Sequence, residues 1–413
     1  MINFEKYKLD NGLTVILHQD KTTPIAAVNI TYNVGSRDEN PNRTGFAHLF
    51  EHLMFGGSKH IPKYDTPLQN VGGENNAFTN VDVTNYYLTL PVQNLETAFW
   101  LESDRMNELA FSQKSLDIQR NVVVEEFKQS YLNQPYGDVM LLLKPLAYKV
   151  HPYQWNTIGK NTEHITEAGM DEVKAFFYTF YRPNNAVLSV AGNLDMPKTK
   201  AMIEKWFGNI AAGTPYRRNL PQEPAQTQAR KLEVERPVPI DCLYKAYRMG
   251  KRTDADFYTV DLISDLLGNG QSARLQQSLV QQKQLFSSIN AYVTGTFDDG
   301  LLIINGYLNP SVPLSLADEA LQSELEKLKN KAIGEYELQK VKNKVQTVLS
   351  YSELQVQDKA MNLGIAETMS DAEMINNELD RYNAIKIEDI LASSQNILNE
   401  VNCSTLYYRA GTI

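Results

Sequence analysis

Two histidines and a glutamate in one short segment, His48, Glu51 and His52, are the residues of this sequence best suited to chemistry. Residues four apart lie on one face of an α-helix, one turn from each other, so both imidazoles can be directed at one point with the carboxylate beside it. Two imidazoles suit a zinc ion, and a third ligand with an open position makes such a site catalytic. The alternative is a pair of solvent-facing histidines with an acid between them.

The surrounding residues favour a helix with one buried face. The string H-x-x-E-H is the inverted form of the H-E-x-x-H signature of zinc peptidases. Apolar residues recur around it at helical spacing, and Gly56-Gly57 predicts the end of the helix. These apolar residues are Phe46, Leu49, Phe50, Leu53 and Met54. We therefore expect the two histidines to face inward or into a cleft.

A carboxylate is the usual third ligand beside two histidines, and Glu102, Glu125 and Glu126 are the candidates on predicted helices. The helix expected from Ser115 to Tyr131 buries Val122, Val123 and Phe127, and Glu126 lies nearer to that face. Glu125 is rotated by about 100° from Glu126. The pattern thus favours Glu126, while a solvated helix face carrying both glutamates is the alternative.

The overall composition excludes several classes of function. The chain has 413 residues, 42% of them hydrophobic, and a net charge of -9, which argues against binding to nucleic acid or to an anionic membrane. Cys242 and Cys403 are far apart and predict neither a disulfide framework nor a cysteine zinc site. The sequence shows no signal peptide and no run of 18 apolar residues. A cytoplasmic location is favoured, with a periplasmic or organellar one possible if a targeting segment was removed.

The elements that position these residues recur in the second half of the chain. Asp10-Asn11-Gly12 predicts a hairpin, and strands and helices alternate after it. The segment 260–267 repeats the apolar pattern of 47–54 at an offset of 213 residues. The repeat places Asp261, Ser264 and Asp265 where His48, Glu51 and His52 stand, so it cannot form the same nitrogen site.

The expected fold is α+β, with two similar domains that are each a mainly antiparallel sheet with helices packed on one face. We expect a zinc-bearing N-terminal domain over 1–212. A proline-rich linker over 213–239 and a C-terminal domain without metal ligands over 240–413 follow it.

Several segments together resemble the pitrilysin and mitochondrial-processing-peptidase family of zinc peptidases, over essentially the whole chain. They are Val34–Arg37, Gly45–Phe55, Asn76–Thr79, Arg120–Glu126, Tyr181–Asn185 and Gly192–Asp195. The resemblance implies a metallohydrolase fold like that of LuxS and the processing peptidases. It also implies a zinc endopeptidase with one Zn²⁺ per chain.

The resemblance also assigns residues. The third ligand of the family falls on Glu126, and Glu51 is the general base. An extended peptide substrate is implied along the strand of Asn76, Ala77, Phe78 and Thr79, although these four residues alone indicate no more than an edge strand. Gln119 stands where the family has an auxiliary glutamate, so it can donate a hydrogen bond to the ligand set but adds no charge.

One part of the family pattern is missing. Active members carry an arginine and a tyrosine seven residues apart in a C-terminal domain, where they hold substrate and stabilise the oxyanion. Counting along the chain places Val280 and Ser287 at these positions, while Lys283 and Tyr292 are nearby but out of register. Arg274 matches an arginine at the start of that helix, for which a structural role is expected.

The expected protein is therefore the zinc subunit of a heterodimer whose related partner lacks the metal motif and supplies the pair. Two chains of this type would close around the peptide. A self-sufficient homodimeric peptidase and a non-catalytic assembly subunit are the alternatives.

Overall fold

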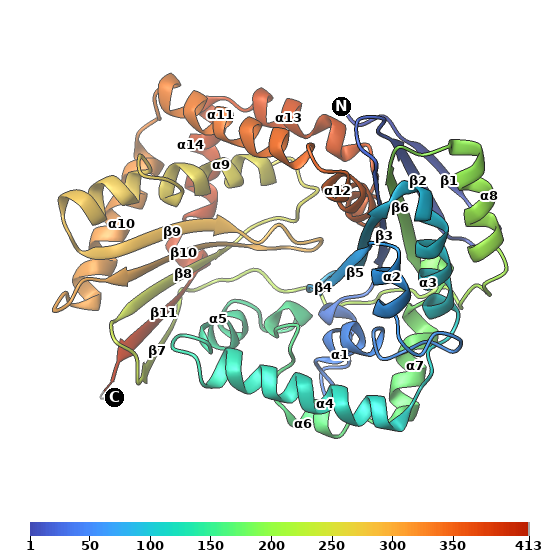
Figure 1. Ribbon diagram of the computed structural model, residues 1–413. Helices are drawn as coiled ribbons and strands as arrows, with labels where there is room; N and C mark the ends of the chain where they lie inside the picture. The colour runs from blue at the N-terminus through green and yellow to red at the C-terminus, as the bar shows by residue number, and fades with distance from the viewer. Residues whose placement is uncertain (412–413) are drawn as a thin grey trace. The chain divides into compact units, whose positions relative to one another are not determined.

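The computed structural model describes residues 1–411 and divides into two compact units. The first unit consists of Met1–Gln129, Trp155–Leu220 and Ser350–Asn377. The second consists of Ser130–Gln154, Pro221–Leu349 and Glu378–Ile413, described here to Gly411. Each unit has one sheet and its own set of helices (Figure 1).

The sheet of the first unit has six strands in the order β1-β2-β6-β3-β5-β4. Its strands are β1 (Glu5–Lys8), β2 (Thr14–Gln19), β3 (Ile25–Tyr32), β4 (Glu74–Thr79), β5 (Thr84–Pro91) and β6 (Ala186–Gly192). All neighbours are antiparallel except β2 and β6. The predicted hairpin joins β1 to β2, with Gly12 at a φ of 89°. β4 lies at one end of the order and, among residues 1–411, pairs only with β5.

Helices cover both faces of this sheet. They are α1 (Phe46–Leu53), α2 (Asp65–Asn70), α3 (Leu95–Asn107), α4 (Gln113–Phe127), α6 (Glu163–Thr166), α7 (Met170–Phe180), α8 (Met196–Phe207) and α12 (Val356–Met369). Consecutive strand residues point to opposite faces. On β3, the Tyr32 ring packs against that of Tyr181, just after α7, whereas Thr31 faces Gly364 of α12. A Cβ at Gly364 would lie 2.8 Å from the Thr31 hydroxyl, so glycine permits this close approach.

The sheet of the second unit has five strands in the order β7-β11-β8-β10-β9. They are β7 (Arg230–Arg236), β8 (Cys242–Arg248), β9 (Phe286–Val293), β10 (Leu301–Leu308) and β11 (Cys403–Ala410). Only β7 and β11 are parallel. The two sheets therefore share the same plan of antiparallel strands with one parallel pair.

Helices also cover both faces of the second sheet. They are α5 (Val139–Ala147), α9 (Phe257–Gly268), α10 (Leu314–Asn330) and α14 (Ile387–Ile397), with α11 (Glu335–Ser352) and α13 (Met374–Ala384) crossing the boundaries between units. On β11, Tyr408 donates to Asp138 at the start of α5, whereas Tyr407 donates to Asp318 of α10. Helices α5 and α10 therefore lie on opposite faces.

These contacts confirm the α+β fold class, whereas the expectation of helices on one face of each sheet is wrong, because helices cover both faces. The contacts also show that the two halves of the chain exchange helices. Helix α12, from the C-terminal half, packs on β3 and β6, while α5, from the N-terminal half, packs on β11 and β8. The compact units are consequently discontinuous in sequence, unlike the contiguous segments 1–212 and 240–413. Part of the segment 213–239 is also ordered as β7, because its backbone pairs with β11.

Among the described residues, no helix combines the length and the apolar content needed to cross a lipid bilayer.

Candidate metal centre

The helix that carries the two histidines is α1, and Glu39 caps its N-terminus. The N-cap residue Gly45 has a φ of 91° and no side chain to accept the first N–H groups. Instead, the buried Glu39 carboxylate accepts hydrogen bonds from the N–H of Gly45 at 2.9 Å and of Ala47 at 2.8 Å. The indole of Trp155 donates to the same carboxylate at 3.2 Å. Burial raises the pKa of Glu39 to about 8 despite these donors.

The predicted apolar stripe of α1 is confirmed as a buried face. Leu49 and Phe50 are fully buried, and Phe50 stacks on Phe176 and Tyr181 at centroid distances of 4.9 and 5.1 Å. This packing holds the helix against the rest of the first unit. It leaves the opposite side of α1, which bears the histidines, partly open to solvent.

The side chains of His48, His52 and Glu126 converge on one point. Nε2 of His48 lies 3.7 Å from one oxygen of Glu126, and Nε2 of His52 lies 3.5 Å from the other. Each of the three residues offers one ligand atom, and these atoms all lie within 4.8 Å of one another. Helix α4 supplies Glu126 because its buried residues Val123 and Phe127 flank that side chain. Two nitrogens and one carboxylate oxygen form the donor set of a catalytic zinc site.

The protonation tendencies of these groups also suit a metal. Burial lowers the pKa of His48, which favours the neutral imidazole with a free lone pair. The hydrogen bond with His52 lowers the pKa of Glu126, which favours the carboxylate. Metal ligands must be in these unprotonated forms, so the residues present fit a zinc ion.

The other two glutamates considered as third ligand have different partners. Glu125 is exposed and forms an ion pair with Lys128 at 2.7 Å. Glu102 is buried with Arg105, whose guanidinium donates two hydrogen bonds to it. Neither carboxylate belongs to the group of converging ligand atoms.

Glu51 is held by a residue of the edge strand. The hydroxyl of Thr79 on β4 donates a hydrogen bond of 2.6 Å to Oε2 of Glu51. This bond leaves the other carboxylate oxygen available for a proton. Sequence reasoning singled out Thr79 for substrate contact and missed this bond, because nothing local in the sequence links residues 28 apart.

The residues predicted to bind substrate, Asn76, Ala77 and Phe78, and the predicted auxiliary residue Gln119 form, in the described part of the chain, no hydrogen bond with the metal-binding group that would define a role. Asn76 is exposed and its side chain accepts from the N–H of Ala77 at 2.8 Å, while Phe78 is half-buried. Gln119 lines a cavity between the segment that follows α1 and the first turns of α4, and within residues 1–411 its amide has no hydrogen bond to the three ligands. The substrate role of the strand and the auxiliary role of Gln119 stay predictions.

The repeated positions in the second unit hold no comparable group. Asp261 accepts a hydrogen bond from Tyr382 at 2.6 Å, and Asp265 forms an ion pair with Lys344 at 3.0 Å. The hydroxyl of Ser264 donates to the backbone oxygen of Asp261. In the described part of the chain, His48, His52 and Glu126 are the only such group of three.

The positions expected for the arginine and the tyrosine carry no charge. Val280, in the π-helix Gln276–Gln282, packs against the core, and Ser287 donates to the backbone of Tyr307. The nearby Lys283 is held by Glu324 at 3.0 Å. Arg274 donates two hydrogen bonds to Glu337, at 2.7 and 2.8 Å, which supports its expected structural role.

Comparison with known proteins agrees with this geometry. Residues 14–158 match the model of the insulinase family (peptidase family M16), and residues 168–345 match the M16 inactive domain. The zinc protease PqqE of Helicobacter pylori is 30% identical over 348 residues, covering 82% of this chain and 77% of that protein. The chain belongs to the M16 peptidase family. This M16 chain is a zinc metallopeptidase, and His48, His52 and Glu126 are its metal-binding group.

Other relatives extend the likeness along the whole chain. The zinc protease YmxG of Bacillus subtilis is 27% identical and covers 96% of both chains. The crystal structure of a protease from Helicobacter pylori superposes with a TM-score of 0.93 at 26% identity, covering 99% of this chain and 100% of that one. The β subunit of the mitochondrial-processing peptidase of Saccharomyces cerevisiae is 28% identical over 49% of this chain and 44% of its own length.

Proposed function

We propose that this M16 chain is an endopeptidase that hydrolyses extended peptides or unfolded segments. The observation that carries the proposal is the convergence of His48, His52 and Glu126 beside a glutamate that is not a ligand, Glu51. Helix α1 carries three of these four residues and lies against β4, whose outer edge has no strand partner among the described residues. One site therefore combines a metal-binding group, a base and a free strand edge.

His48, His52 and Glu126 would hold the zinc ion. When bound, zinc supplies a Lewis acid that polarises a carbonyl group and lowers the pKa of water. Glu51 takes a proton from the attacking water as general base and returns it to the leaving amine nitrogen as general acid. Thr79 keeps the Glu51 carboxylate in place for both transfers through its hydrogen bond.

The substrate would lie along β4 as an added strand. An edge strand presents unpaired N–H and C=O groups, and their pairing with a peptide gives affinity without strong sequence preference. The exposed Asn76 and the half-buried Ala77 and Phe78 would contact substrate side chains. Gln119 would support the ligand set from the neighbouring turns of α4.

We further propose that two chains close around the peptide, and that a related partner without the metal motif supplies an arginine and a tyrosine. Val280, which has no polar group, and Ser287, whose hydroxyl donates to the backbone oxygen of Tyr307, support this proposal. The relative that is a β subunit of a processing peptidase supports it as well. An intact metal group disfavours a non-catalytic assembly subunit.

The decisive experiment separates metal binding from proton transfer. In Glu51→Gln we expect zinc content to stay at one ion per chain while peptide hydrolysis falls roughly 10²- to 10⁴-fold, the contribution of a general base. Zinc content is measured by elemental analysis and hydrolysis with fluorogenic peptides. Glu125→Gln, a change on an exposed neighbour of Glu126, is the matched control and should keep both properties. Undiminished hydrolysis by Glu51→Gln would refute the assignment of the base.

A further inference from the structure

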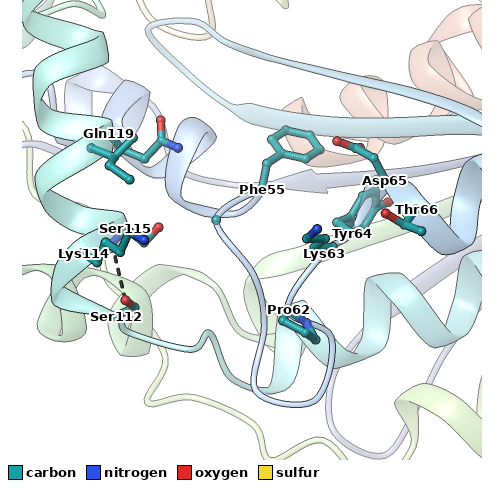
Figure 2. Close-up of a pocket in the computed structure, with 12 residues that line it drawn as sticks. Phe55, Pro62, Lys63, Tyr64, Asp65, Thr66, Ser112, Lys114, Ser115 and Gln119 are labelled. Carbon is teal, nitrogen blue, oxygen red and sulfur yellow. Dashed lines mark hydrogen bonds between the residues drawn. The ribbon is translucent and has the colours of Figure 1, made fainter.

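A cavity of about 430 Å³ opens between the segment that follows α1 and the first turns of α4 (Figure 2). Phe55, three residues after His52, and Gln119, seven residues before Glu126, both line it. Seven helical residues span about 10 Å, so the cavity lies within reach of a peptide side chain two or three extended residues from the cleaved bond. All lining residues belong to the first unit.

The charged groups of this cavity are mainly positive. Lys63 and Lys114 lie on opposite walls, and the only acidic lining residue is Asp65 (Figure 2). The amide of Asn75 donates to Asp65 at 2.9 Å. Within residues 1–411, neither lysine forms an ion pair or a hydrogen bond. Two lysines that have no ion pair among the described residues thus line one cavity, in a protein whose net charge is -9.

Neither lysine has an evident structural role. Lys114 stands in the first turn of α4, where a positive charge opposes the helix dipole and weakens the helix. Lys63 is exposed and lies just before α2. Neighbouring lysines differ in this respect, since Lys59 pairs with Glu108 and Lys128 pairs with Glu125. Sequences break local rules most often at functional positions.

We propose that this cavity is a specificity subsite that binds a carboxylate of the peptide substrate through Lys63 and Lys114. The inference rests on the proposed peptidase function and names a feature of the substrate. The hydroxyls of Thr66, Ser112 and Ser115, also in the lining, supply further donors for carboxylate oxygens. The carboxylate comes either from an Asp or Glu side chain near the cleaved bond or from the C-terminus of a short peptide.

The test measures a ratio of rates within each enzyme preparation. The zinc-loaded chain, with its partner where one is needed, is assayed on peptides that carry Glu or Gln in turn at each position around the cleaved bond. Each peptide is made with a free and with an amidated C-terminus. We expect kcat/KM for one Glu position to exceed that for Gln roughly 10-fold, and the preference to shrink as salt is added.

The variants assign this preference to the cavity. In Lys63→Met/Lys114→Met the Glu-to-Gln ratio should fall to near 1, whereas Lys8→Met/Lys21→Met, which changes two exposed lysines outside the cavity, should keep it. A preference that follows the free C-terminus alone identifies the terminal carboxylate as the ligand. Equal rates for Glu and Gln with no effect of the C-terminus overturn the subsite, as does a full preference in the double variant. If no peptide is cleaved, neutral ones included, the proposed function itself fails, and the subsite with it.

Discussion

At the scale of single residues, the Thr79 hydroxyl fixes the orientation of the proposed base. Thr79→Val keeps the shape of the side chain and removes the 2.6 Å hydrogen bond to Glu51. A hydrogen bond to a charged group contributes about 1.5 kcal/mol, so kcat should fall roughly 10-fold with KM and zinc content unchanged. Steady-state kinetics and elemental analysis check this outcome.

A variant on the neighbouring strand controls for general effects on the sheet. Thr89 of β5 has no side-chain hydrogen bond among the described residues, so Thr89→Val should leave kcat near the wild-type value. A Thr79→Val enzyme with wild-type kcat, or one that lost its zinc, would contradict the role assigned to this hydroxyl.

The residues of the metal group could be anticipated because their signals are local. His48 and His52 lie within one helix, and Glu126 and its apolar neighbours lie within another. In each helix the period of 3.6 residues determines which side chains share a face. The bond between Thr79 and Glu51 joins a strand to a helix, and the cap from Glu39 joins a loop to α1. No periodicity in the sequence reports such contacts, so the structure alone reveals them.

At the scale of elements, α1 depends on Glu39 for its cap, and this dependence should vary with pH. Burial raises the pKa of Glu39 to about 8, against 4.5 for the ordinary carboxyl group. The folded protein therefore binds this proton more tightly than the unfolded chain. The contribution of Glu39 to stability is full below about pH 4.5 and is lost as the pH rises through 8, with a slope of at most about 1.4 kcal/mol per pH unit.

The comparison with Glu39→Gln isolates this slope, because glutamine has no proton to lose. The free energy of unfolding of the wild type minus that of Glu39→Gln should decrease between pH 5 and pH 8. Urea unfolding of the metal-free proteins gives this difference, followed by the fluorescence of Trp100, Trp155 and Trp206, which all lie in the first unit. A difference that is constant over this pH range would show that Glu39 does not titrate in the folded state.

The spacing of apolar residues predicted the helix that carries His48 and His52, and the turn residues predicted the hairpin of β1 and β2; both are present. The spacing of hydrophobic residues along the sequence does not indicate which sheet a helix covers. The assignment of α12 to the first unit rests on the approach of Gly364 to the β3 side chains, a contact between distant parts of the sequence. Similarly, β7 lies in a segment rich in proline, and its pairing with β11 determines its conformation.

At the scale of the whole molecule, the first unit has the metal group and the base, and the second has neutral side chains at the expected oxyanion positions. We expect the isolated chain to hydrolyse peptides slowly. Addition of a related chain that lacks H-x-x-E-H and carries the arginine and tyrosine should raise the rate roughly 10²- to 10³-fold, the contribution of oxyanion donors. Sedimentation should show a complex of one chain of each kind, and Glu51→Gln in this chain should abolish the gain. A rate that is already high and does not respond to the partner would favour the homodimer, because the oxyanion would then be stabilised by residues of this chain.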